Sequence, residues 1–201
     1  MGLAATLALA HAAQATTYSN LGNGDVSSFG SPDTTTYGKE FTAPGGALQS
    51  WSFWTDGGFA GDLKLVVAAW NGSQAVGPAL YDSAAQANDG SRDHQINFSG
   101  INTNLKAGSQ YVVYFTIAGV SNPTLHTPFE ISPTNGGLNG SSVYLNSNGV
   151  DPLTITEAWN FIPDLRFSAV FGATAVPEPA TLGVLAIGLV GLVVARRRKF
   201  I

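Results

Sequence analysis

Nine stretches of the chain alternate apolar and polar residues or run apolar between turn residues, as β-strands do. They are 37–42, 47–55, 62–70, 79–83, 94–98, 110–118, 127–132, 142–146 and 165–172. The alternation is strongest in 62–70, 110–118 and 165–172, where every second side chain is apolar and lies on one face of the strand. We expect these three strands to supply the core.

Turn residues separate the stretches. Asn71-Gly72 directly follows the strongly alternating stretch 62–70, and this dipeptide favours a β-hairpin there. With 24 Gly and 10 Pro, the composition also fits many turns and short strands. Nine strands in a chain of 201 residues predict an all-β fold with one core, namely a β-sandwich.

Composition and charge exclude some classes of protein and of partner. The chain has no cysteine, so it needs no disulfide to fold, as suits an exported bacterial protein. Four of the nine basic residues follow one another at 196–199, which leaves the rest of the chain acidic. Such a body offers no basic face, and we expect no nucleic-acid partner.

The beginning of the chain has the features of an export signal. Residues 1–10 are apolar, and Ala13 and Ala15 supply the small side chains that signal peptidase needs at its cleavage site. We expect 1–15 to be a signal peptide, shortened at its start because no basic residue precedes the apolar stretch, and 16–174 to be the mature body. Two alternatives are a first strand of the body and a myristoylated N-terminus.

The end of the chain predicts one transmembrane helix. Residues 180–195 are apolar and uncharged, and a helix of that length is roughly 24 Å long, which is short but sufficient to span a bilayer. A buried core helix is the alternative, but it would show a polar face. The basic residues that follow should stay in the cytoplasm and stop transfer: Arg196, Arg197, Arg198 and Lys199.

An extended motif precedes this apolar segment. In Pro177-Glu178-Pro179 the two prolines prevent regular helix or strand pairing and hold the segment accessible. Followed by the apolar segment 180–195 and the basic cluster 196–199, the segment 175–201 closely resembles the PEP-CTERM sorting signal. The resemblance implies processing by an exosortase, an integral-membrane enzyme resembling cysteine transpeptidases, in Gram-negative bacteria that make extracellular polysaccharide. Pro177, Glu178 and Pro179 would then be the recognition motif.

The body carries a looser resemblance. Residues 41–83 are similar to the sandwich bodies of PEP-CTERM proteins of unassigned role. This similarity implies an antiparallel, jelly-roll-like β-sandwich, and a fold alone does not supply a function.

Signals for catalysis are weak. The chain has no G-x-S-x-G, H-E-x-x-H or P-loop motif. His94 and His126 could serve as bases, and Asp56 with Asp62 could form a glycosidase pair, but exposed loop positions are the more ordinary interpretation. We therefore expect no enzymatic activity.

Asp89 and Asp93, on either side of Gly90, are a weak candidate for calcium binding. Solvated loop carboxylates are the simpler interpretation. We therefore expect no cofactor.

Aromatic residues offer one candidate for ligand binding. Strand alternation points Trp51 and Phe53 to one face and Trp54 to the other, while Trp70 opposes the apolar face of 62–70. Trp54 and Trp70 could stack on sugar rings if they are exposed, although core packing is the alternative.

Three functions follow from these observations, in decreasing order of support. The first is a non-enzymatic cell-surface or extracellular-matrix protein, exported, held in the inner membrane by its C-terminal helix and processed by exosortase. The resemblance associates it with exopolysaccharide or biofilm. The alternative is a carbohydrate-binding module that uses exposed aromatic residues, and a secreted hydrolase is a weaker third.

Overall fold

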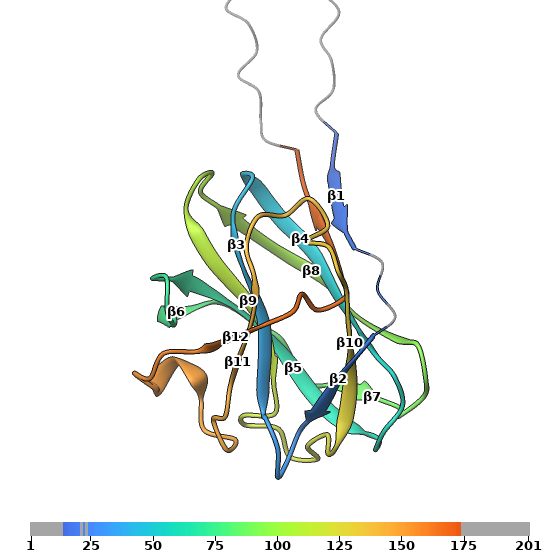
Figure 1. The fold of residues 1–201 in the computed structure, drawn as a ribbon. Helices are drawn as coiled ribbons and strands as arrows, with labels where there is room; N and C mark the ends of the chain where they lie inside the picture. The colour runs from blue at the N-terminus through green and yellow to red at the C-terminus, as the bar shows by residue number, and fades with distance from the viewer. Residues whose placement is uncertain (1–13, 21, 23, 174–201) are drawn as a thin grey trace, which may run out of the picture. The chain divides into compact units, whose positions relative to one another are not determined.

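The computed structural model describes residues 14–20, 22 and 24–173, and residues 15–173 form one compact unit (Figure 1). Most of the predicted signal peptide, the Pro177-Glu178-Pro179 motif, the apolar segment 180–195 and the basic cluster 196–199 lie outside the described residues. Within the described part, no helix has the length and apolar character needed to cross a membrane.

The body consists of two antiparallel β-sheets (Figure 1). In the first sheet the order is β1 (Thr16–Ser19), β13 (Phe167–Phe171), β4 (Gly46–Thr55), β10 (Thr127–Ile131) and β2 (Gly24–Phe29), with β8 (His94–Leu105) also on β4. In the second the order is β12 (Asn160–Ile162), β11 (Ser142–Leu145), β3 (Thr36–Thr42), β9 (Gln110–Thr116), β5 (Gly61–Trp70) and β6 (Ala75–Asp82), with β7 (Gln86–Asn88) on β5. A short 3₁₀ helix, η1 (Pro152–Thr154), lies between β11 and β12.

The predicted all-β fold of two antiparallel sheets is confirmed, while its jelly-roll-like character stays a prediction. The strongly alternating stretch 62–70 is β5 almost residue for residue, and the hairpin after it forms around Asn71-Gly72. The side-chain oxygen of Asn71 accepts hydrogen bonds from the backbone N–H groups of Ser73 and Gln74 at 3.0 Å each, which holds this turn.

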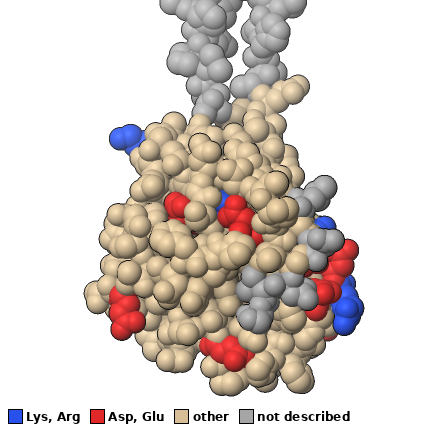
Figure 2. All heavy atoms as spheres, viewed as in Figure 1, with Lys and Arg blue, Asp and Glu red and all other residues tan. Residues whose placement is uncertain are grey.

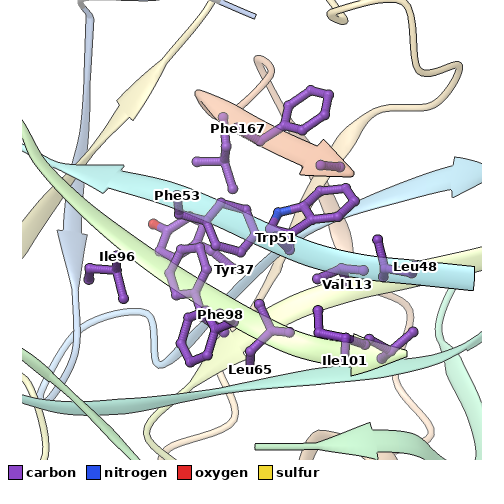
Figure 3. Packing of buried hydrophobic residues seen from close by; sticks show 14 of the residues in the cluster. Tyr37, Leu48, Trp51, Phe53, Leu65, Ile96, Phe98, Ile101, Val113 and Phe167 are labelled. Atoms are coloured by element: carbon purple, nitrogen blue, oxygen red, sulfur yellow. The ribbon is translucent and has the colours of Figure 1, made fainter. Parts of the chain in front are cut away.

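The main core lies between the sheets and combines aromatic with aliphatic side chains (Figure 3). Phe115 of the second sheet stacks on Phe129 of the first with ring centroids 3.9 Å apart, and it meets Phe53 of the first sheet edge-on at 4.5 Å. Trp51 and Phe53 come from the inward face of β4, as alternation predicts. The two sheets are thus joined by ring packing across their inner faces.

A second core covers the outer face of the second sheet. Trp70 packs edge-on against Trp159 with centroids 5.7 Å apart, and Tyr114 meets the same Trp159 at 5.3 Å. Leu153 of η1 packs against this cluster. Strands β5 and β9 are therefore buried on both faces, which explains why 62–70 combines strong alternation with apolar residues at the intervening positions.

Both ends of the body lie at the same end of the sandwich. Thr16 at the start of β1 pairs with Phe171 at the end of β13. The ring centroids of Phe171 and Phe41 are 6.0 Å apart, so the end of β3 lies there too. Tyr37, four residues earlier on β3, lies about 13 Å further along the strand, toward the opposite end.

Candidate functional site

The outer face of the first sheet carries Trp54, the first candidate for ligand contact. Trp54 is half-buried, on the face of β4 opposite Trp51 and Phe53. The guanidinium carbon of Arg166 lies 4.4 Å from the centroid of its indole ring, within the range of a cation–π contact. One side of the ring is therefore occupied by Arg166.

Arg166 is itself held by two carboxylates. Its Nη1 donates to Oε2 of Glu130 and to Oδ1 of Asp93, both at 2.6 Å. Glu130 is only 5% exposed, and this burial raises the pKa of its carboxyl group, while the bond from Arg166 acts against the rise. Arg166 thus neutralises a buried charge and is fixed over Trp54.

Amide and hydroxyl groups continue this outer face beside Trp54. The hydroxyl of Ser52 donates to Oδ1 of Asn97 at 2.9 Å and accepts from Nε2 of Gln95 at 3.0 Å. Gln95 and Asn97 are exposed on β8. The surface can therefore hydrogen-bond a hydroxyl-rich ligand next to an aromatic edge.

Trp70, the second aromatic candidate, lies in the second core. Only 5% of its surface is exposed, and Trp159 packs against its ring. A ring buried in this way presents no face to a sugar. Of these two residues, Trp54 therefore remains the candidate for ligand contact.

The two aspartates considered for calcium serve different contacts. Asp89 accepts from the backbone N–H of Ser91 at 2.8 Å and from its hydroxyl at 2.6 Å, and these bonds lower the pKa of Asp89. Asp93 is bound to Arg166. Among residues 14–20, 22 and 24–173, no group of three or more His, Asp or Glu side chains is placed to hold a metal ion.

Each of the two histidines of the body lies beside a carboxylate. Nδ1 of His126 is 2.7 Å from Oδ2 of Asp33, and Nδ1 of His94 is 3.5 Å from Oδ1 of Asp89. Asp56 and Asp62 lie at the end of β4 and the start of β5, and both are partly exposed. These four residues do not form a recognised catalytic arrangement.

A buried ion pair between the sheets was not anticipated. Lys39 is 0% exposed, and its Nζ lies 2.8 Å from Oδ1 of Asp164 and 3.1 Å from the carbonyl oxygen of Gly140. Ser142 donates to the same carboxylate at 3.3 Å. The sequence contains a sign of the buried lysine. Lys39 lies two residues from both Tyr37 and Phe41, so strand alternation places all three side chains on the same, inward face of β3.

Comparison with known proteins gives one match. The PEP-CTERM protein-sorting motif matches residues 175–199, the segment that the sequence analysis singled out. No curated protein and no solved structure matches the chain. The roles of Pro177, Glu178, Pro179 and the basic cluster 196–199 stay predictions, since these residues lie outside the described ones.

Proposed function

We propose that this chain, a PEP-CTERM protein, is a non-enzymatic component of the cell surface or extracellular matrix, associated with exopolysaccharide or biofilm. Its motif implies export and exosortase-dependent sorting, with exosortase as the processing partner. The observation that carries the proposal is this motif at residues 175–199. The motif itself implies sorting; the surface location, the matrix role and the lack of enzymatic activity are what we propose in addition.

The architecture of the body supports this role. Because Thr16 pairs with Phe171, the residue leading into the C-terminal segment and the first residue of the mature body lie at one end of the sandwich. The opposite end of the sandwich, where β3 begins, carries neither of these two junctions. Such an arrangement suits a domain displayed on a surface.

The C-terminal segment is predicted to contain separate residues for enzyme recognition and for membrane insertion, and this separation can be tested. Glu178 lies between two prolines outside the predicted membrane span 180–195, so its charge is available to a processing enzyme. The apolar span and the basic cluster 196–199 should determine insertion and orientation without it. Glu178→Ala should therefore give an intact precursor that stays in the membrane.

The experiment compares membrane and extracellular fractions in a host with an exosortase, by blot and intact mass. Glu157→Ala, which changes an exposed glutamate of the body, is the matched control and should be processed like the wild type. Neutral residues in place of Arg196, Arg197 and Arg198 should instead disturb topology. Release and trimming of Glu178→Ala at the wild-type level would show that the motif is not read through this carboxylate.

Glycan recognition is a second candidate function. The half-buried ring of Trp54 with exposed Gln95 and Asn97 beside it favours this function. Sugar rings stack on an indole and offer hydroxyls to amides. Trp54→Ala should then weaken binding of a glycan by about 1–3 kcal/mol.

A further inference from the structure

A groove of about 660 Å³ opens at the end of the sandwich where β3 begins. The end of β2, the loop between β2 and β3, and the start of β3 form one side of the groove. Strands β11 and β12 and the residues that directly follow each of them supply the rest of the lining. The residues that matter here are Asp33, Thr34, Tyr37, Tyr144, Asn146 and Asn148. The volume is within the range of about 300–1,000 Å³ that is typical of ligand sites.

Aromatic and amide groups meet in this groove. Tyr37 and Tyr144 are paired across β3 and β11, and their ring centroids are 5.8 Å apart. Tyr37 is only 5% exposed, whereas Tyr144 is half-buried and supplies the accessible aromatic surface. The exposed side chains of Asn146 and Asn148 stand beside it, so apolar contact and hydrogen bonds are available together.

A smaller hollow of about 390 Å³ adjoins the groove. Pro32 and Asn148 line both hollows, so these two residues form the ridge between them. Two adjoining hollows suit an extended chain that crosses the ridge better than one compact small molecule.

The charge of the lining limits the ligand. Asp33 is the one ionisable carboxylate among the residues that line the two hollows, and no Lys or Arg is among them. Nδ1 of His126 lies 2.7 Å from Oδ2 of Asp33. Charged side chains are also sparse over the face seen in Figure 2. A polyanion would find no cation in these hollows, whereas hydroxyl groups would find acceptors and donors.

We propose that this groove binds a segment of a neutral glycan, with a sugar ring on Tyr144 and hydroxyl groups on Asn146, Asn148 and Asp33. The inference deepens the proposed function, since it rests on the association with exopolysaccharide and names the surface that makes the contact. It differs from the second candidate, which places the glycan on Trp54.

Native affinity electrophoresis of the full chain, in one mild detergent throughout, tests the proposal. The gels contain a neutral β-glucan, a neutral mannan, neutral exopolysaccharide from a host with an exosortase, or anionic alginate. The double variant Asn146→Ala/Asn148→Gly removes both amides, and glycine suits position 148 because Asn148 has a φ of 50°. The control Asn104→Ala/Asn102→Gly changes two exposed asparagines outside the groove lining, and Asn102 has a φ of 49°.

We expect at least one neutral glycan to retard the wild type and the control equally. The double variant should bind about tenfold more weakly, because two hydrogen-bonding groups are lost. Two results would overturn the proposal: no retardation by any neutral glycan, with or without retardation by alginate, or equal retardation of the double variant and the wild type. Loss of binding in Trp54→Ala with no loss in the double variant would assign the glycan to Trp54 instead. Sorting of Glu178→Ala is measured in a separate experiment. The proposal of exosortase-dependent sorting and the proposal of glycan binding in the groove can therefore fail independently.

Discussion

Replacing Asp164 with asparagine tests whether buried Lys39 depends on its counter-charge. The two charges are 2.8 Å apart, and at an effective dielectric constant of about 20 their attraction is about 6 kcal/mol. That attraction offsets the desolvation of the ammonium, which costs several kcal/mol. Asp164→Asn leaves the ammonium near the carbonyl of Gly140 and 5.3 Å from the ring centroid of Phe167. We expect the free energy of unfolding to fall by about 3–5 kcal/mol.

Removing the other partner should cost less. In Lys39→Met the carboxylate of Asp164 keeps the bond from Ser142, and its side chain is 14% exposed, so water reaches it. We expect a loss of about 1–3 kcal/mol. The double variant Lys39→Met/Asp164→Asn should be close to the wild type, because an apolar replacement of a buried ion pair is often neutral.

The pH dependence supplies an independent measurement. Burial lowers the pKa of Lys39 below its ordinary value of 10.5, and Asp164 partly offsets this effect. Between the lowered pKa and 10.5 the unfolded chain binds more protons at this site, so the free energy of unfolding rises with pH. Asp164→Asn removes the offset, so the rise should begin at a lower pH, and Lys39→Met should abolish it. The measurement should stay below pH 10.0, the ordinary pKa of Tyr37, because burial raises the pKa of this tyrosine and its titration has the opposite sign.

Urea unfolding of the full chain, followed by tryptophan fluorescence and combined in a double-mutant cycle, gives the coupling energy. Additive losses, with a coupling below about 0.5 kcal/mol, would refute the reasoning, since the pair would then be independent. Equal pH dependence in the wild type and in Lys39→Met would show that Lys39 does not titrate differently in the folded protein.

Two further predictions concern the body. Residues 16–174, expressed without the ends, should be a monomeric β protein whose stability is unchanged by reductant, because the chain has no thiol; a helical circular dichroism spectrum would contradict this. Trp70→Ala should lower the free energy of unfolding by about 3–5 kcal/mol in urea titrations, because Trp70 is packed against Trp159. The half-buried Trp54 is the control, with a smaller loss expected for Trp54→Ala, and equal losses would argue against the second core.

Strands that bury one or both faces could be predicted from the sequence, whereas strands held mainly by a partner could not. In 62–70 most side chains are apolar, so the sequence of this stretch alone indicates that the strand is buried. By contrast, β1 and β12 are short, largely exposed segments that exist as strands because β13 and β11 pair with them. Their sequences carry no clear period-two pattern, so no local signal marks them.

The candidate surfaces depend even more on contacts between distant residues. Arg166 covers Trp54 although more than a hundred positions separate them, and nothing local to either residue predicts the contact. The burial of Trp70 likewise requires Trp159 from the segment after η1. The charge of Lys39 on an inward position was visible from alternation, but its partner Asp164 comes from the far end of the body.

The pairing of β1 with β13 at one end of the body determines how the body would carry mechanical load. A pull that enters at Phe171, with the far end of the sandwich held by a bound glycan, runs along β13 between β1 and β4. Hydrogen bonds between antiparallel strands are perpendicular to the strands, so this direction shears them. In shear the bonds on both sides of β13 share the force, whereas peeling would break them one after another. A pull of this kind would therefore load the ladders of β13 in shear rather than by peeling.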